Sequence, residues 1–147
     1  MLPGALAMKI YFAGSIRGGR DDWYLYREII ALLSGYGDVL TEHIGSSELA
    51  VTGEDLPDKE IYDRDLDWLK RCDYLVAEVT RPSLGVGFEI GKATEWGKRV
   101  LCLYRPSITP SLSAMIAGCE GVTLQAYEEI EELQLVLANH FRSTAVK

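Results

Sequence analysis

The sequence predicts a single α/β domain in which helices cover both faces of a five-stranded parallel sheet. Short apolar segments with β-branched residues alternate five times with longer segments whose apolar residues recur at helical spacing. Most of the connecting segments are short, which favours parallel strands joined by helical crossovers. With 147 residues, 48% of them hydrophobic, the chain is long enough for one such domain with its core and too short for two.

The first part of the chain supplies two strand–helix units. A first strand is predicted from Met8, followed by a turn that contains glycines. Asp22, or the aspartate before it, can cap the next helix, whose apolar residues form one stripe. A second strand is predicted over residues 38–43 and a second helix over residues 58–70. The segment between them, 44–57, has no sustained period and is long for such a connection, which is typical of a functional or mobile loop.

The rest of the chain supplies the three remaining units. Residues 73–79 are apolar and partly β-branched, as in a central strand that is buried on both faces. The elements expected after it are a helix over 88–98, a strand over 99–104, a short helix around Met115, a strand over 122–124 and a closing helix over 127–141. This succession predicts a doubly wound, flavodoxin-like or Rossmann-like sheet with strand order 2-1-3-4-5. The domain would cover residues 8–142, between a short extension (1–7) and a short tail (143–147).

Composition and charge narrow the classes of partner. The formal net charge is −7, so we expect neither a nucleic-acid polymer nor an anionic membrane to be drawn to this surface. The apolar start of the sequence lacks a basic leader and a full-length apolar core, which predicts no secretory signal or transmembrane span. Cys72, Cys102 and Cys119 form no CxxC or Cys/His pair, which predicts reduced packing residues and no zinc site. We therefore expect an intracellular protein of the cytoplasm, with the nucleus as a further location.

The turn after the predicted central strand is the first candidate for chemistry. In open α/β sheets, ligands bind outside the carboxyl ends of the strands, where glycine-rich turns lead into helix N-termini that attract anions. The residues expected to form this turn are Pro82, Ser83, Gly85 and Gly87. Glu89 is then expected in or near the first turn of the following helix. An acid at that position also complements the helix dipole, so this stretch alone does not assign it a catalytic role.

A second turn with glycines follows the first predicted strand. Neighbouring strands end in the two turns, so the turns are expected to face each other across the switch point of the sheet. The amides around Gly18 and Gly19, together with the charge of Arg17, suit a phosphomonoester. Ser15 and Ser83 would add hydroxyl groups, one from each turn. The segment SIRGGR is neither a Walker nor a Rossmann fingerprint, and a solvated basic turn is the alternative.

Six motifs in combination resemble one enzyme family. They are YFAGSIRGGR, LTEH, DLDWL, AEVTRPSLGVGFEIGKA, RVLCLYRP and LSAMI, and they span about residues 9–141. Together they resemble the 2′-deoxynucleoside 5′-phosphate N-hydrolases, which are relatives of the nucleoside 2-deoxyribosyltransferases. The resemblance implies hydrolysis of the N-glycosidic bond of 2′-deoxynucleoside 5′-monophosphates to free base and 2-deoxyribose 5-phosphate, with no cofactor and no metal.

The resemblance also implies roles for three residues. Glu89 matches the glutamate that attacks C1′ of the deoxyribose and forms a glycosyl-enzyme ester, which water then hydrolyses. Asp65, in DLDWL, matches the acid and base of a mechanism like that of retaining glycosidases. Tyr11 matches the tyrosine that holds the nucleophile by a hydrogen bond, and a buried tyrosine with another partner is the alternative. Asp67 lies two positions after Asp65, so it should point to a different helix face as a solvated acid.

Substrate-binding residues follow from the same resemblance. Ser113 is implied to reach the phosphate from the neighbouring subunit, so a homodimer is expected; a serine that only caps a helix start is the alternative. His43 is expected to close the second strand beside the site, as a binding residue. Phe88 stands where the family can have a tyrosine. The binding residues implied are Ser15, Ile16, Arg17, Gly18, Gly19, Ser83, Gly85, Ser113 and His43.

Two other functions stay open from the sequence. A deoxyribosyltransferase would pass the sugar to another base instead of water, but unphosphorylated nucleosides would leave Arg17 and the serines of the phosphate site unused. A nucleotide-binding module that has lost turnover is the other alternative. The joint presence of Tyr11, Asp65 and Glu89 argues against such a module.

Overall fold

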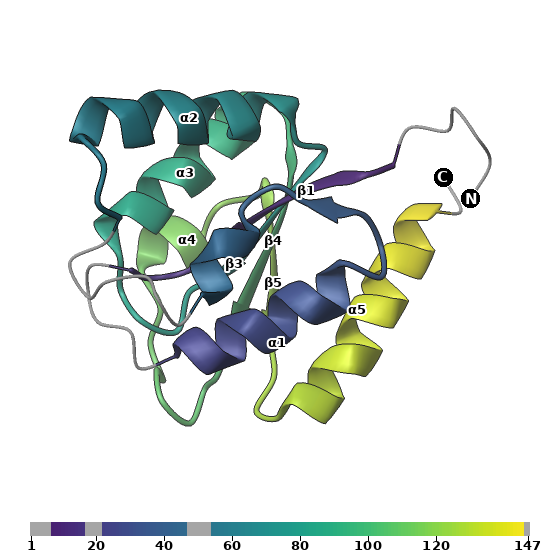
Figure 1. Ribbon diagram of the computed structural model, residues 1–147. Helices are drawn as coiled ribbons and strands as arrows, with labels where there is room; N and C mark the ends of the chain where they lie inside the picture. Colours follow the sequence, from purple (N-terminus) through teal and green to yellow (C-terminus); the bar gives the residue numbers. More distant parts are fainter. Residues whose placement is uncertain (1–6, 17–21, 47–53, 146–147) are drawn as a thin grey trace.

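Helices cover both faces of a parallel sheet in the computed structural model (Figure 1). The structure describes residues 7–16, 22–46 and 54–145. Within these residues, five strands lie in the order β2-β1-β3-β4-β5, and every neighbouring pair is parallel. The predicted fold class and strand order are confirmed.

Strands and helices alternate along the chain. The strands are β1 (Lys9–Ala13), β2 (Asp38–Val39), β3 (Tyr74–Glu78), β4 (Arg99–Tyr104) and β5 (Val122–Ala126). The helices are α1 (Trp23–Leu33), α2 (Asp58–Arg71), α3 (Leu84–Glu95), α4 (Ala114–Ala117) and α5 (Ile130–Ala145), with a 3₁₀ helix, η1 (Glu42–Gly45), after β2. Helices α1 and α5 pack on one face of the sheet, and α2 and α3 pack on the other (Figure 1).

Alternate residues of β1 belong to the two different cores. Ile10 and Phe12 lie in the core beneath α1 and α5, whereas Tyr11 and Ala13 lie in the core beneath α2 and α3. This division follows from the alternation of side chains along a strand. All of β3 is buried, as expected for a strand that is covered on both faces. The alternation therefore places Tyr11 on the face of the sheet covered by α2 and α3.

The second strand is shorter than predicted. Strand β2 ends at Val39, and the chain then turns into η1, which contains His43. The reason is the side chain of Thr41, whose Oγ1 donates to the backbone oxygen of Phe12 at 2.6 Å and accepts from the Phe12 amide at 2.8 Å. This side chain satisfies the groups of β1 that a longer β2 would have paired. The prediction that His43 closes the second strand is therefore wrong.

Helix α3 begins earlier than predicted. Ser83 is its N-cap, because the Ser83 Oγ accepts a hydrogen bond from the amide of Val86 at 3.2 Å. Gly85 and Gly87 therefore lie inside the helix and not in the preceding turn, which corrects the prediction. Glu89 consequently lies in the second helical turn, further from the start of the helix than predicted.

The other elements lie close to their predicted bounds. Strand β5 extends to Ala126, and α5 begins at Ile130, a few residues after the predicted start. The three cysteines are free thiols, of which Cys72 and Cys102 are buried and Cys119 is partly buried. Among the helices of the described ranges, none is both long enough and apolar enough to cross a membrane.

A buried polar network joins the start of α1 to the carboxyl ends of β3 and β4. Glu78 accepts hydrogen bonds from the hydroxyls of Thr80 and Tyr127, at 2.9 and 2.5 Å. Arg105 donates to Asp22 at 2.5 Å, and its Nε lies 3.4 Å from Glu78. These charges are almost fully buried, which is tolerated because they pair with one another. Asp22 stands at the N-cap of α1, as predicted, but its carboxylate is engaged by Arg105 and makes no capping hydrogen bond; Asp21, the predicted alternative, lies outside the described residues.

Candidate active site

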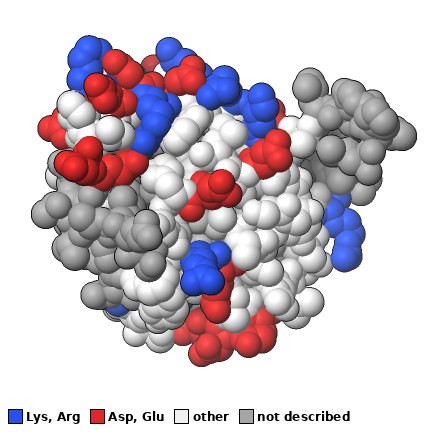
Figure 2. Space-filling model, viewed as in Figure 1, with Lys and Arg blue, Asp and Glu red and all other residues white. Residues whose placement is uncertain are grey.

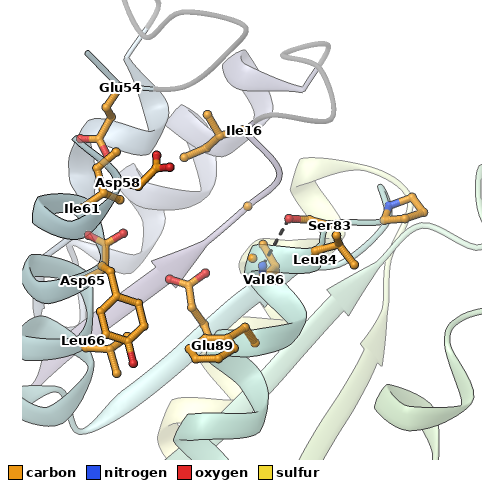
Figure 3. Close-up of a pocket in the computed structure, with 15 residues that line it drawn as sticks. Ile16, Glu54, Asp58, Ile61, Asp65, Leu66, Ser83, Leu84, Val86 and Glu89 are labelled. Atoms are coloured by element: carbon orange, nitrogen blue, oxygen red, sulfur yellow. Dashed lines mark hydrogen bonds between the residues drawn. The ribbon is translucent and has the colours of Figure 1, made fainter. Parts of the chain in front are cut away.

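A cavity of about 740 Å³ lies at the carboxyl ends of β1 and β3, between α2 and α3 (Figure 3). This size is usual for a small-molecule site. Ile16 borders the cavity beyond β1, and Ser83 borders it at the turn before α3. Asp65 faces it from α2, and Glu89 faces it from α3. The position, at the carboxyl edge of the sheet, is the one at which open α/β sheets bind ligands.

Glu89 and Tyr11 form the central pair of this cavity. Glu89 points from α3 into the cavity (Figure 3). Its Oε2 accepts a hydrogen bond from the hydroxyl of Tyr11. Tyr11 is 2% exposed. Burial raises the pKa of Glu89 to about 7, although the hydrogen bond from Tyr11 lowers it, and the nearby Asp65 adds to the rise. The Tyr11 hydroxyl thus contacts Glu89, as the family resemblance implies.

Asp65 lies on the opposite wall of the cavity, on α2 (Figure 3). Burial raises the pKa of Asp65, and a hydrogen bond from Arg64 partly offsets this rise. Asp67 lies on the exposed face of α2 and pairs with Arg71 at 3.0 Å, as expected for an acid two positions further along a helix. Two carboxyl groups with raised pKa values, Asp65 and Glu89, therefore line one cavity from different helices.

Sequence reasoning missed Glu54, which lines the cavity, and Arg64, which contacts two of the lining residues. Nη1 and Nη2 of Arg64 donate to the two oxygens of Glu54, at 2.7 and 2.5 Å, and these hydrogen bonds lower the pKa of Glu54. Nε of Arg64 donates to Oδ1 of Asp65 at 2.9 Å. Glu54 lies in the segment 44–57, where apolar residues do not recur at a regular spacing, so no pattern indicated its position. Adjacent residues of a helix normally point apart, so no pattern connected Arg64 with Asp65.

The described residues predicted to bind phosphate come from two places: Ser15 and Ile16 follow β1, and Ser83 and Gly85 lie at the start of α3. Ser15 is 1% exposed; its amide donates to the hydroxyl of Tyr26 at 3.1 Å, and its Oγ has no hydrogen-bond partner among the described residues. A buried hydroxyl of this kind is a candidate for a ligand contact. Ile16 and Ser83 border the cavity, as does Gly85 from inside α3. Arg17, Gly18 and Gly19 lie outside the described residues.

Three of the described residues that were predicted to bind substrate, Ser15, His43 and Ser113, are not part of the cavity lining of their own chain. Ser113 is exposed and caps α4, because its Oγ accepts a backbone hydrogen bond at 3.2 Å. This is the contact expected of a helix-start serine. His43 lies on η1, with its Nε2 3.4 Å from Oε1 of Glu54, so it contacts a residue of the cavity wall. Phe88 does border the cavity, beside the ring of Tyr62.

Charge on the described surface is mixed. Acidic and basic side chains alternate along the upper edge of the molecule, where Figure 1 places α2 (Figure 2). Some of them form exposed ion pairs, such as Lys59 with Asp63 at 2.7 Å. In the described part of the chain, no group of three or more His, Cys, Asp or Glu side chains could hold a metal ion.

Known proteins similar to this chain point to one family. The sequence model of the nucleoside 2-deoxyribosyltransferase family matches residues 10–131. A 5-hydroxymethyl-dUMP N-hydrolase from Esox lucius is 50% identical over 141 residues, which cover 92% of this chain and 97% of that protein. The protein with the same name from Homo sapiens is 46% identical over 145 residues, which cover 96% of this chain and 82% of that protein.

A solved structure shares the fold. The CMP N-glycosidase of Clostridium botulinum is similar with a TM-score of 0.66, over 90% of this chain and 98% of that chain. At 18% sequence identity, this likeness supports the fold alone. The family match and the identity with the two N-hydrolases extend over most of the chain. The chain belongs to the nucleoside 2-deoxyribosyltransferase family.

Proposed function

We propose that this chain is a nucleotide N-glycosidase that hydrolyses 2′-deoxynucleoside 5′-monophosphates to the free base and 2-deoxyribose 5-phosphate. The observation that carries the proposal is the carboxylate of Glu89, held by Tyr11 and facing a cavity that Asp65 also lines. A nucleophile and a proton donor on the walls of one cavity are what a retaining glycosidase needs. Relatives with about half of their residues in common with this chain are named N-hydrolases of a deoxynucleotide, which supports the substrate class.

In the first half of the reaction, a carboxylate oxygen of Glu89 attacks C1′ of the deoxyribose. Because Oε2 accepts the hydrogen bond from Tyr11, Oε1 is the oxygen that attacks. The bond from C1′ to the base breaks, its electron pair stays with the base, and the base takes a proton from the carboxyl group of Asp65. The products of this half are the free base, a glycosyl ester of Glu89 and an ionised Asp65. Burial of Asp65 favours its protonated form before this step.

In the second half, water takes the place of the base. The carboxylate of Asp65 accepts a proton from the water molecule as the water oxygen attacks C1′. The ester bond to Glu89 breaks, and its electron pair returns to the Glu89 carboxylate. Both side chains are then in their starting states, and 2-deoxyribose 5-phosphate leaves.

The phosphate group is proposed to bind beyond the end of β1. Ile16 and Ser83 border the cavity here, and the buried hydroxyl of Ser15 directly precedes Ile16 in the chain. Residues 17–19 would complete the phosphate site with backbone amides and the charge of Arg17. Ser113 of the partner subunit would add a hydroxyl across a two-fold interface.

Exposed apolar side chains support a homodimer. Leu84, at the start of α3, is 97% exposed, and Met115, close to Ser113 on α4, is 82% exposed. Large apolar groups on the surface favour burial against a partner. A second copy of the chain packed against Met115 would place the nearby Ser113 in the interface between the two subunits.

Dependence on the phosphate group tests the substrate class. We expect base release from a 5′-monophosphate to exceed that from the matching nucleoside by roughly 100-fold in kcat/KM, because bound phosphate positions C1′ over Glu89. The measurement is chromatography of free base with a panel of deoxynucleotides that includes 5-hydroxymethyl-dUMP, each paired with its nucleoside. Similar rates on both, together with sugar transfer to an added base, would favour the transferase for which the family is named.

A mixed dimer tests the shared site. When a Glu89→Ala chain pairs with a Ser113→Ala chain, one site carries both defects and the other carries neither. This heterodimer should have about half the wild-type activity per dimer, although each parent homodimer is impaired. The heterodimer is purified through two different affinity tags and its turnover is measured directly. Activity no higher than the mean of the two parents would assign Ser113 to its own chain as a helix cap.

A further inference from the structure

Behind Asp65, one guanidinium group joins two carboxylates. Arg64 donates from Nη1 and Nη2 to Glu54 and from Nε to Oδ1 of Asp65. Both edges of the planar group are therefore occupied, and a lysine ammonium cannot reproduce this arrangement. The guanidinium carbon also lies 4.8 Å from the centre of the Trp68 ring. These contacts fix the guanidinium group of Arg64 against Asp65 and Glu54, both of which line the cavity.

We propose that Arg64 and Glu54 are positioning residues for proton transfer by Asp65, an inference that rests on the function proposed above. Because Arg64 occupies Oδ1 of Asp65, Oδ2 is the oxygen that exchanges a proton with the leaving base and then with water. Glu54 holds the guanidinium by two hydrogen bonds, so the orientation of Asp65 depends on both residues. The Asp65 side chain is 22% exposed, which limits competition from solvent for these contacts.

The same residues adjust the charge around Asp65. The ionisable groups that face it are Arg64 on its own helix, His43 and Glu54 from the preceding segments, Tyr11 from β1 and Glu89 from α3, and Asp58 lines the same cavity. Burial raises the pKa of Asp65 most; Arg64 lowers this pKa, and Glu54 raises it. A general acid must be protonated before the first step. The negative charge of Glu54 therefore offsets the positive charge of Arg64, which alone would lower the pKa of Asp65 and favour its ionised form before the first step.

Opposite shifts of the pH profile give the first readout. In Arg64→Met the cation is lost, the pKa of Asp65 rises, and the fall of kcat/KM at alkaline pH should move to higher pH. In Glu54→Gln the guanidinium charge is no longer offset, and the same fall should move to lower pH. The double variant loses one charge of each sign. Its profile should lie near that of the wild type, although its rate is low.

The leaving group gives the second readout. Arg64→Lys keeps the positive charge, but an ammonium group cannot contact Asp65 and Glu54 as the two edges of the guanidinium do. We therefore expect kcat on dUMP to fall roughly 10- to 100-fold, with KM little changed. The loss should be smaller on 5-fluoro-dUMP, because its base leaves more easily and needs less protonation. Arg71→Gln, at an exposed ion pair of the same helix, is the matched control and should change neither readout. Thermal unfolding of each variant identifies any variant that does not fold.

The outcomes separate this inference from the proposed function. Equal losses on both substrates, with the alkaline fall unmoved in Arg64→Met and Glu54→Gln, would overturn the positioning role. Asp65→Asn would in that case still show the leaving-group dependence of a lost acid. If Asp65→Asn also lacks this dependence, the proposed function fails as well. Should Arg64→Met not fold, Glu54→Gln and Arg64→Lys decide the question by the same two readouts.

Discussion

Replacing Glu89 with Gln is expected to lower kcat for base release by roughly 10⁴-fold, because the attacking carboxylate is lost while the side chain keeps its size. Glu89→Ala should be equally inactive. Both variants should still bind the nucleotide, since the proposed phosphate contacts lie beyond β1 and at Ser83. Turnover is measured by chromatography of free base, and binding by calorimetry. Glu95→Gln, at the exposed end of the same helix, is the matched control and should keep wild-type activity.

The wild-type enzyme provides an independent check of the same role. Acid quenching during turnover should trap 2-deoxyribose 5-phosphate as an ester on the peptide that contains Glu89, detectable by mass spectrometry. Substantial turnover by Glu89→Gln, or a sugar trapped on a different peptide, would reject Glu89 as the nucleophile.

Asp65→Asn is expected to lower kcat/KM by roughly 10²- to 10⁴-fold on a substrate with a poor leaving group, because the base then departs without a proton. Part of this loss should be recovered on substrates whose bases leave easily. The measurement is kcat/KM across a series of deoxyuridine monophosphates with different 5-substituents. Asp67→Asn, two positions along α2 on its exposed face, is the matched control and should behave as the wild type.

Equal damage by Asp65→Asn across that series would mean that Asp65 supports the fold or substrate binding and does not supply the proton. A loss that appears mainly in KM would point to the same conclusion, since a proton donated only in the transition state acts on kcat.

The order of elements could be predicted because each strand and helix carries its own periodic pattern. The alternation of five strands with helices was enough to predict the strand order. The continuous apolar run of β3 was enough to predict that it lies in the centre of the sheet. The errors lie where one side chain redirects the backbone. Thr41 ends β2 by binding the backbone of Phe12, and Ser83 starts α3 ahead of two glycines that resemble a turn. Neither hydrogen bond has a periodic signature.

The candidate site divides in a similar way. The roles of Glu89, Asp65 and Tyr11 came from resemblance to a family, and the structure brings Tyr11 into contact with Glu89 and places Asp65 in the same cavity. Glu54 and Arg64 could not be assigned from sequence, because their role depends on contacts between a loop and a helix. Such contacts are set by tertiary packing, which local patterns of charge do not encode.

Strand β2 also has a consequence for the behaviour of the protein in concentrated solution. It forms one edge of the sheet and is only two residues long. Exposed edge strands present unpaired backbone groups on which a strand of another molecule can add, and this is a common start of aggregation. At this edge the Thr41 hydroxyl already occupies the amide and the carbonyl of Phe12. The Thr41 side chain therefore blocks the part of β1 that the short β2 leaves unpaired, so a strand of another molecule cannot form backbone hydrogen bonds there.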